Sequence, residues 1–349
     1  MRLGVSAAVV DGALVPGDVA LDDGLVTAVG VPGRGAGTAV PGFVDLQVNG
    51  YGGADLLTEP ERWREVDALL AEIGVTTWQP TLISAEPEQT VRALRTIELG
   101  VHLEGPFLAL PGAHPRECLR LPDRALAETF LATGRVASVT IAPELPGAAE
   151  LIEKLRRHDV VVSLGHSAAD AATAHAAFDG GARTVTHLFN VMRPFAHRDP
   201  GLAGAALARE DVVVQLICDG VHLADETVLL AWRAARGRLV VVSDAIAAAG
   251  LGDGRYRLGA TDVEVEDGVS RTRDGALAGG TSSVPAAVRR LAALGVPLAE
   301  AVDAGTRAPA RLLGRSDVGT LEPGTRADVV VLDDDLRVTR VLRGGISVG

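Results

Sequence analysis

Three apolar runs of the chain end beside a side chain that can bind a metal ion. Glu104 closes one run, His166 follows a second, and His187 lies at the end of a third. One carboxylate and two imidazoles form a donor set that holds a catalytic divalent ion and leaves a coordination position open for water. A further run ends at Asp244, whose carboxylate could take a proton from that water. These residue types therefore predict a metal-dependent hydrolytic site.

The segments that must position these side chains alternate between strand-like and helix-like patterns. Such alternation is typical of a parallel sheet, and eight strand-like runs are what a closed (β/α)8 barrel of the TIM type requires. The runs cover residues 43–48, 76–83, 101–104, 137–142, 160–165, 184–188, 212–218 and 239–244. Because the loops after the strands build the active site in this fold, we expect the polar residues that follow the runs to share one mouth of the barrel.

The two ends of the chain carry a different pattern. Residues 1–40 and 317–349 alternate apolar and polar positions around turn signals such as Asp11-Gly12. Because an isolated hairpin is marginal in water, we expect both ends to pair into one small β-sandwich. The sequence thus predicts two domains: a sandwich made of residues 1–40 and 317–349, and a catalytic barrel over residues 41–316.

Composition and charge exclude several classes of function. The 349 residues are 47% hydrophobic and 22% charged, which favours a large core over disorder. A formal net charge of −12 argues against binding to nucleic acid or to an anionic membrane. No apolar run reaches the roughly 18 residues of a membrane helix, and no signal-peptide pattern is present. Cys118 and Cys218 form no disulfide framework, so we expect a cytoplasmic protein with reduced thiols.

Seven stretches match, in the same order and over nearly the whole chain, the motifs of a known family. They are residues 41–50, 102–107, 142–144, 165–167, 186–192, 200–204 and 243–245. In these stretches the chain resembles the amidohydrolase superfamily, and within it the branch that deacetylates N-acetylglucosamine 6-phosphate. The resemblance implies that Glu104, His166 and His187 are the ligands of the catalytic metal.

The number of metal ions follows from two neutral side chains. Gln47 and Asn49 stand where many members of the superfamily carry His-x-His, and amides are poor ligands for zinc-like ions. Lys154, the one lysine of the chain, lies in an amphipathic helical pattern and is wrongly placed to bridge two metals as a carboxylated lysine. We therefore expect one divalent ion per subunit, zinc first, with iron, manganese and cobalt also suited to the donor set.

The resemblance also implies roles in catalysis and binding. The metal would lower the pKa of its water toward ~7, while Asp244 acts as general base and then as general acid. His114 would stabilise the tetrahedral oxyanion by hydrogen bonding. Arg198, whose guanidinium fork matches a phosphate, and His222 would bind the phosphate of the substrate. Further implied substrate contacts are Gln47, Ala113, His114, Asn190, Val191, Leu277, Ala278 and Gly279.

Three hypotheses stay open on the sequence. The leading one is a hydrolase that converts N-acetylglucosamine 6-phosphate to glucosamine 6-phosphate and acetate in amino-sugar catabolism. The second is another deacetylase of the same fold, acting on N-acetylgalactosamine 6-phosphate or an N-acyl amino acid. The third is a non-catalytic binding protein, against which the intact ligands and Asp244 speak. Because the phosphate-binding loop of similar enzymes can reach across a subunit interface, we also expect a homodimer.

Overall fold

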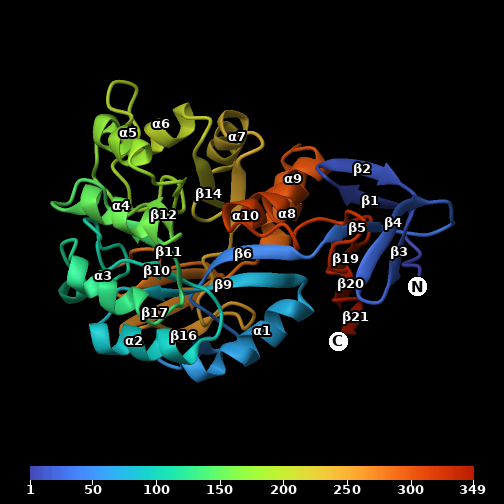
Figure 1. The fold of residues 1–349 in the computed structure, drawn as a ribbon, viewed down its shortest axis with the longest axis horizontal. Helices are drawn as coiled ribbons and strands as arrows, with labels where there is room; N and C mark the ends of the chain where they lie inside the picture. Colours follow the sequence, from blue (N-terminus) through green and yellow to red (C-terminus); the bar gives the residue numbers. More distant parts are fainter. The chain divides into compact units, whose positions relative to one another are not determined.

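The computed structural model describes residues 1–349, which divide into two compact units. One unit consists of residues 1–45, 67–78 and 283–349, and the other of residues 46–66 and 79–282. Strands β6 (Phe43–Val48) and β9 (Val75–Ile83) each belong partly to both units. Figure 1 shows the elements in chain order, with the two termini near each other in the first unit.

The first unit joins strands from both ends of the chain, as predicted. Its six-stranded sheet has the order β2-β1-β5-β19-β20-β21, in which β5 pairs in parallel with β1 and antiparallel with β19. The hairpin β3-β4 completes the sandwich, and an apolar core that includes Leu3, Val19 and Leu342 fills it. The strands are β1 (Ala7–Val10), β2 (Ala13–Pro16), β3 (Asp18–Asp22), β4 (Leu25–Val31), β5 (Thr38–Pro41), β19 (Val329–Leu332), β20 (Val338–Arg343) and β21 (Ile346–Val348).

The first unit is larger than the predicted sandwich. It also holds α8 (Val284–Ala293), α9 (Leu298–Ala304) and α10 (Arg307–Leu312), which the predicted boundary at residue 316 placed in the barrel. The reason is local pairing: Arg307 forms ion pairs with Asp11, beside β1, and with Asp303 on α9. The amino-terminal strands and the last helices thus pack as one body, so the observed division differs from a boundary at residue 316.

An eight-stranded sheet contains all the predicted barrel strands in chain order. Besides β6 and β9 it consists of β10 (Val101–Glu104), β11 (Val136–Ile141), β12 (Val161–Leu164), β13 (Thr184–Val185), β14 (Val213–Ile217) and β15 (Leu239–Val242). Neighbouring strands from β9 to β15 run parallel. Val48 bridges Ala245, just after β15, and the Asn49 N–H donates to the Ala245 carbonyl at 2.7 Å. The first and last strands therefore meet, and the (β/α)8 prediction is confirmed.

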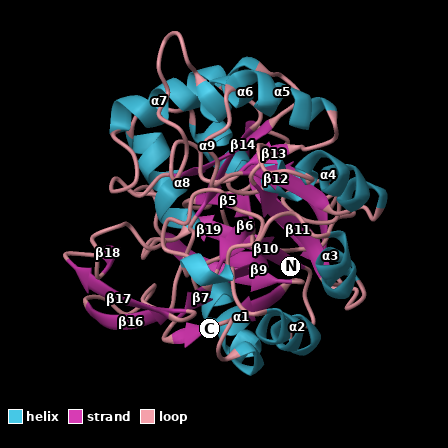
Figure 2. Cartoon of the chain, turned by 90° about the vertical axis from the view of Figure 1, so that its left-hand side faces the viewer, coloured by secondary structure: helices cyan, strands magenta, loops and turns pink.

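Helices follow most of the strands and lie outside the sheet (Figure 2). Aspartates cap two of them: Asp123 accepts from the Ala125 and Leu126 N–H groups, and Asp170 accepts from Thr173 N–H, which satisfies the free donors of a helix start. The helices are α1 (Trp63–Glu72), α2 (Pro87–Thr96), α3 (Arg124–Leu131), α4 (Ala148–Arg157), α5 (Ala171–Asp179), α6 (Gly201–Ala208) and α7 (Asp225–Ala234), with short 3-10 turns η1 (Pro60–Arg62) and η2 (Arg116–Cys118). None has the length and apolar character needed to span a bilayer.

Two small sheets extend the loops after the barrel strands. β7 (Gly50–Tyr51) and β8 (Ala54–Asp55) form a short hairpin after β6. After β15 the chain makes an antiparallel sheet of β16 (Gly254–Leu258), β17 (Thr261–Glu266) and β18 (Val269–Thr272). This second sheet matters for the site because Leu258 and the turn after β18 return to the mouth of the barrel.

Candidate metal centre and active site

The three predicted ligands meet at the mouth of the barrel. His187 Nε2 lies 3.0 Å and His166 Nε2 3.3 Å from Glu104 Oε1, and the two Nε2 atoms are 3.1 Å apart. Each of the three residues is 3% exposed. An ion bound tetrahedrally at about 2.0–2.1 Å separates its donors by about 3.3 Å. The triangle of lone-pair donors is close to that spacing, so these residues fit a divalent cation.

The backbone turns sharply at the residues that face this centre. His166 has φ +49°, His187 φ +28° and Asp244 φ +50°. The backbone of a residue other than glycine is strained in this left-handed region, and such strain concentrates at functional sites. Because each turn comes directly after a barrel strand, it ends the alternation of the strand and directs the side chain into the mouth.

Two contacts orient the ligands from behind. His166 Nδ1 lies 2.8 Å from the Leu110 carbonyl, to which it donates, so that Nε2 keeps its lone pair for the centre. Gln47 Nε2 donates to Glu104 Oε1 at 3.0 Å. His187 Nδ1 is buried and has no hydrogen-bond partner. Gln47 was predicted as a substrate contact. In the structure it is fully buried and contacts Glu104, one of the three predicted metal ligands.

Burial and mutual contact separate the pKa values of the ligands. Burial lowers the pKa of His166 to about 4. Burial would also lower the pKa of His187, but the hydrogen bond to Glu104 outweighs it and raises that pKa. Burial opposes ionisation of Glu104, yet its contacts with His114, His166 and His187 hold its pKa well below the usual range. The carboxylate is therefore an anion, as a cation ligand must be.

Asp244 faces the same cavity and has a different environment. Burial, together with the nearby charge of Glu104, raises the pKa of Asp244 to about 7. Asn49 Nδ2 donates to Asp244 Oδ1 at 2.9 Å, whereas Asn49 Oδ1 is buried without a partner. A carboxyl group with a pKa near neutrality is suited to accept and return a proton.

His114 presents one defined nitrogen to the cavity. The Ser84 N–H donates to His114 Nδ1 at 3.1 Å, which makes Nδ1 an acceptor. The proton of the neutral ring is then on Nε2, 3.4 Å from Glu104 Oε2. His114 is therefore placed as a hydrogen-bond donor beside the metal ligands.

The cavity over these groups has a volume of about 250 Å³ and is lined by most of the predicted site residues. Arg198 is exposed, in the loop between β13 and α6, and does not line the cavity. Ala278 is fully buried and also lies outside the lining. The predicted residues that line it are Glu104, Ala113, His114, His166, His187, Asn190, Val191, His222, Asp244, Leu277 and Gly279.

Several lining residues were not singled out as contacts from the sequence. Asn49 follows β6, and its contact with Asp244 depends on closure of the barrel between β6 and β15. Ile83, Ile217 and Leu258 form an apolar wall. Ile83 ends a strand-like run and Ile217 lies one residue before the end of another, and these positions were the signal available for them. Leu258 has no such signal, because it belongs to the excursion after β15.

A carboxylate supports His222 at the edge of the cavity. Asp219 Oδ2 lies 2.7 Å from His222 Nδ1, and Oδ1 accepts the N–H groups of Val221 and His222 at 2.8 and 2.9 Å. Burial opposes ionisation of Asp219, but these hydrogen bonds and the charge of His222 lower its pKa to about 2. The pair thus directs His222 Nε2 away from Asp219 and gives the imidazole a permanent anionic partner.

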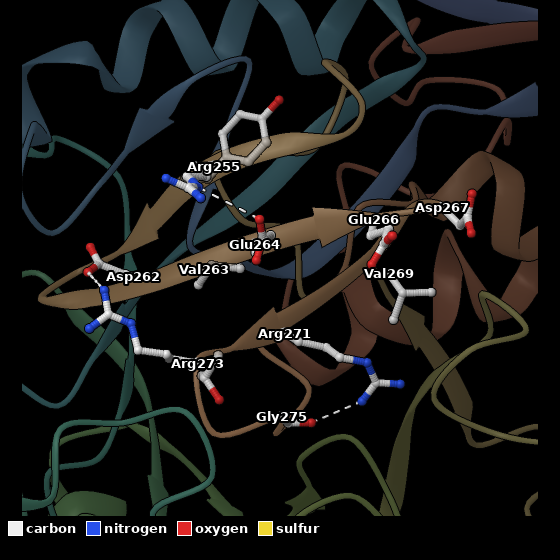
Figure 3. A pocket seen from close by; sticks show the side chains of 12 residues that line it. Arg255, Asp262, Val263, Glu264, Glu266, Asp267, Val269, Arg271, Arg273 and Gly275 are labelled. Atoms are coloured by element: carbon white, nitrogen blue, oxygen red, sulfur yellow. Dashed lines mark hydrogen bonds and ion pairs between the residues drawn. The ribbon is translucent and has the colours of Figure 1, made fainter.

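A larger hollow of about 680 Å³ lies on the sheet β16–β18 (Figure 3). Its charges face one another: Arg255 lies 3.7 Å from Glu264, and Arg273 lies 3.7 Å from Asp262. No metal-ligand cluster lies there. Despite its size, this hollow therefore lacks the chemistry found at the barrel mouth.

Comparison with known proteins agrees with this geometry. The model of the amidohydrolase family matches residues 38–347. The chain belongs to the amidohydrolase family. It is 38% identical over 343 residues to an N-acetylgalactosamine-6-phosphate deacetylase of Escherichia coli O157:H7, covering 91% of each chain. It is 40% identical to the N-acetylglucosamine-6-phosphate deacetylase of Bos taurus, covering 85% of this chain and 80% of the relative.

The similarity of this chain to one solved structure extends over the whole fold. It is N-acetyl-D-glucosamine-6-phosphate deacetylase from Mycobacterium smegmatis, an alanine variant in complex with N-acetyl-D-glucosamine 6-phosphate. Its TM-score is 0.95 at 36% identity, with 100% of this chain and 99% of that chain covered. For this amidohydrolase, fold, family and ligand cluster thus agree with one another.

Proposed function

We propose that this amidohydrolase removes the acetyl group from N-acetyl-D-glucosamine 6-phosphate and releases D-glucosamine 6-phosphate and acetate. The observation that carries the proposal is the convergence of Glu104, His166 and His187 beside Asp244 in one cavity. The names of relatives at 36–40% identity support the substrate. Glu104, His166 and His187 would hold the ion, for which zinc is the first choice and iron, manganese and cobalt the others. When bound, the ion supplies Lewis-acid activation of water and of the amide carbonyl.

The side chains of the cavity perform the remaining steps. Asp244 takes a proton from the attacking water and later gives one to the departing amine. Asn49 holds Asp244 Oδ1 and so fixes the direction of the carboxylate. His114 donates from Nε2 to the oxygen that becomes negative as the carbonyl is attacked. The apolar wall of Ile83 and Ile217 keeps the reacting groups from bulk water.

Recognition of the phosphate rests on nitrogen donors of His222 and Arg198. His222, held by Asp219, is the one predicted phosphate ligand that lines the cavity of a single chain. Arg198 is exposed on a loop, where it is free to reach the cavity of a neighbouring subunit. We therefore include a homodimer in the proposal, with Arg198 supplied across the interface. Substituting Arg198→Ala should raise KM for the phosphorylated sugar, and an unchanged kcat/KM would remove Arg198 from the binding site.

Acetate release from matched substrates tests the proposal. Purified protein with its metal content determined should hydrolyse N-acetylglucosamine 6-phosphate faster than N-acetylgalactosamine 6-phosphate, and both far faster than unphosphorylated N-acetylglucosamine. A preference for the galacto sugar would reassign the substrate to that of the Escherichia coli relative. Equal activity on the unphosphorylated sugar would contradict phosphate recognition. If the metal-loaded protein released no acetate at all, the catalytic proposal would be wrong.

A further inference from the structure

One buried histidine at the base of the site has no part in the reaction steps above. His102 lies two residues before Glu104 on β10, so both side chains point to the same face of the strand. His102 Nδ1 lies 3.2 Å from Thr81 Oγ1, and Nε2 lies 2.7 Å from Thr140 Oγ1. His102 is 3% exposed. Both ring nitrogens thus bind hydroxyls of the neighbouring strands β9 and β11 in the interior of the barrel.

The hydrogen bonds continue from strand to strand. Thr140 Oγ1 lies 2.8 Å from Thr186 Oγ1, which in turn bonds to Ser163 Oγ. We call Thr81, His102, Thr140, Thr186 and Ser163 the hydroxyl girdle; all five side chains are buried. Thr81, His102, Thr140 and Ser163 lie on the consecutive strands β9 to β12, and Thr186 directly follows β13.

One direction of donation satisfies the girdle from Thr81 through His102 and Thr140 to Thr186. The backbone N–H of Val48 donates to Thr81 Oγ1 at 3.1 Å, which leaves the Thr81 hydroxyl proton for His102 Nδ1. The ring proton is then on Nε2 and points to Thr140, whose hydroxyl donates onward to Thr186. In this arrangement the neutral imidazole of His102 provides one acceptor and one donor. An aliphatic side chain at this position would provide neither.

The girdle joins the three strands that carry the metal ligands. His102 precedes Glu104 by two residues on β10, and Thr186 directly precedes His187. Ser163 lies on β12, three residues before His166. The girdle therefore lies one layer beneath the ligand triangle, and a shift of any of these strands would move a ligand.

We propose that His102 is a positioning residue for the metal centre: through the hydroxyl girdle it holds β10, β12 and β13 at the spacing that Glu104, His166 and His187 need to share one ion. The proposal rests on the proposed function only in requiring a metal ion at these ligands. Groups that orient ligands from behind typically contribute 10–100-fold to metal affinity.

Two pairs of variants test the proposal by metal binding. His102→Leu and Thr140→Val remove the polar atoms at similar volume, whereas His102→Gln and Thr140→Ser keep a polar atom for the girdle. The probe is Co²⁺: its affinity is measured by competition with a chromophoric chelator, and its visible absorption reports the coordination geometry. We expect the apolar variants to bind Co²⁺ about 10–100-fold more weakly with an altered spectrum, and the polar variants to recover both properties.

A matched control separates positioning from general stability. Ser138 Oγ donates to Gln79 Oε1 at 2.9 Å, a buried bond between β11 and β9 that joins none of the ligand strands. Ser138→Ala should lower the melting temperature yet leave Co²⁺ affinity and spectrum unchanged. If Thr140→Val weakens Co²⁺ binding no more than Ser138→Ala does, the girdle is merely structural and the proposal is overturned, whether or not His102→Leu folds. If the wild-type protein binds no Co²⁺, the proposed metal centre itself is wrong.

Discussion

The two carboxylates of the site have opposite environments. Glu104 is held as an anion by its contacts with three histidines, whereas burial and the charge of Glu104 raise the pKa of Asp244 to about 7. Groups whose pKa values are pushed apart in this way take different roles in catalysis. Glu104 is thereby suited to be a permanent ligand and Asp244 to exchange a proton.

Replacing Asp244 with asparagine tests this division. Asp244→Asn removes the proton acceptor but none of the three clustered ligands, so kcat should fall by about 10²–10⁴-fold while the bound metal remains. Acetate release and metal analysis on the same sample provide the measurement. His166→Ala is the contrasting variant, because it should lose the metal together with the activity. Metal loss from Asp244→Asn equal to that from His166→Ala would show that Asp244 is a ligand.

The Asp219–His222 pair makes a prediction about binding and pH. Because the pKa of Asp219 is lowered to about 2, its carboxylate is ionised throughout the range above pH 4. Asp219→Asn removes this charge from beside His222, and losing a charge-assisted hydrogen bond of about 1.5–3 kcal/mol corresponds to a KM for the phosphorylated sugar raised by about 10–150-fold. We expect kcat to stay within about twofold, since the pair does not touch the reacting amide.

Two comparisons complete that test. Asp219 is ionised at both pH 6 and pH 8, so comparing KM at these two values shows no contribution from titration of Asp219 itself in the wild-type protein. Hydrolysis of unphosphorylated N-acetylglucosamine should be unaffected by the substitution. An equal loss of activity on both sugars would indicate that Asp219 supports the fold of the loop instead of phosphate binding.

The turn after β18 fixes the position of the segment that carries Asp244. The Gly280 N–H donates to the Asp244 carbonyl at 2.7 Å, and the Ile246 N–H donates to the Gly280 carbonyl at 3.1 Å. A Cβ at Gly280 would lie 2.2 Å from the Ser243 carbonyl oxygen, a backbone atom that no rotamer change can move. The excursion β16–β18 is thus joined to the barrel mouth at a position that only glycine fits.

Gly280→Ala should therefore displace Asp244 and lower kcat at least tenfold, since misplacement of a reacting group by about 1 Å costs up to 10²-fold. Kinetics together with the melting temperature check this result. Gly275→Ala is the control, because its left-handed backbone (φ +87°) is also strained by alanine but nothing lies within 4 Å of its Cβ. Similar kcat values for the two variants would contradict a specific effect on Asp244.

Local pattern predicted most of the barrel and only part of the site. Residues 43–48 and 101–104 are β6 and β10 as predicted, whereas the run 184–188 is shortened to Thr184–Val185 because His187 takes a left-handed backbone. The clustering of Glu104, His166 and His187 could be expected because each lies at or just after the end of its own strand. The contact between Asn49 and Asp244 could not, because it joins residues 195 apart through closure of the barrel.

For the whole molecule, phosphate binding involves more than one chain in our proposal. The sequence predicted Arg198 and His222 as a pair, yet His222 lines the cavity and Arg198 is exposed outside it. The motif that contains Arg198 indicates the residue's role but carries no information on which subunit it serves. Sedimentation of the purified protein, combined with kinetics of mixed Arg198→Ala and Asp244→Asn subunits, would separate the two arrangements: activity recovered on mixing requires Arg198 to act across an interface.

Metal removal should change the stability of the protein as well as its activity. The Glu104–His166–His187 triangle joins three strands of the barrel, and an ion that binds only the folded chain stabilises it by RT ln(1 + [L]/Kd), about 2.7 kcal/mol at a hundredfold excess over Kd. Chelation should therefore lower the melting temperature by a few degrees, and added Zn²⁺ should restore it. His166→Ala, which lacks one donor, should melt at the same temperature with or without chelator. If wild-type protein behaved in this way too, no ion would be bound at the triangle, and the three buried donors would have to be satisfied by shared protons alone.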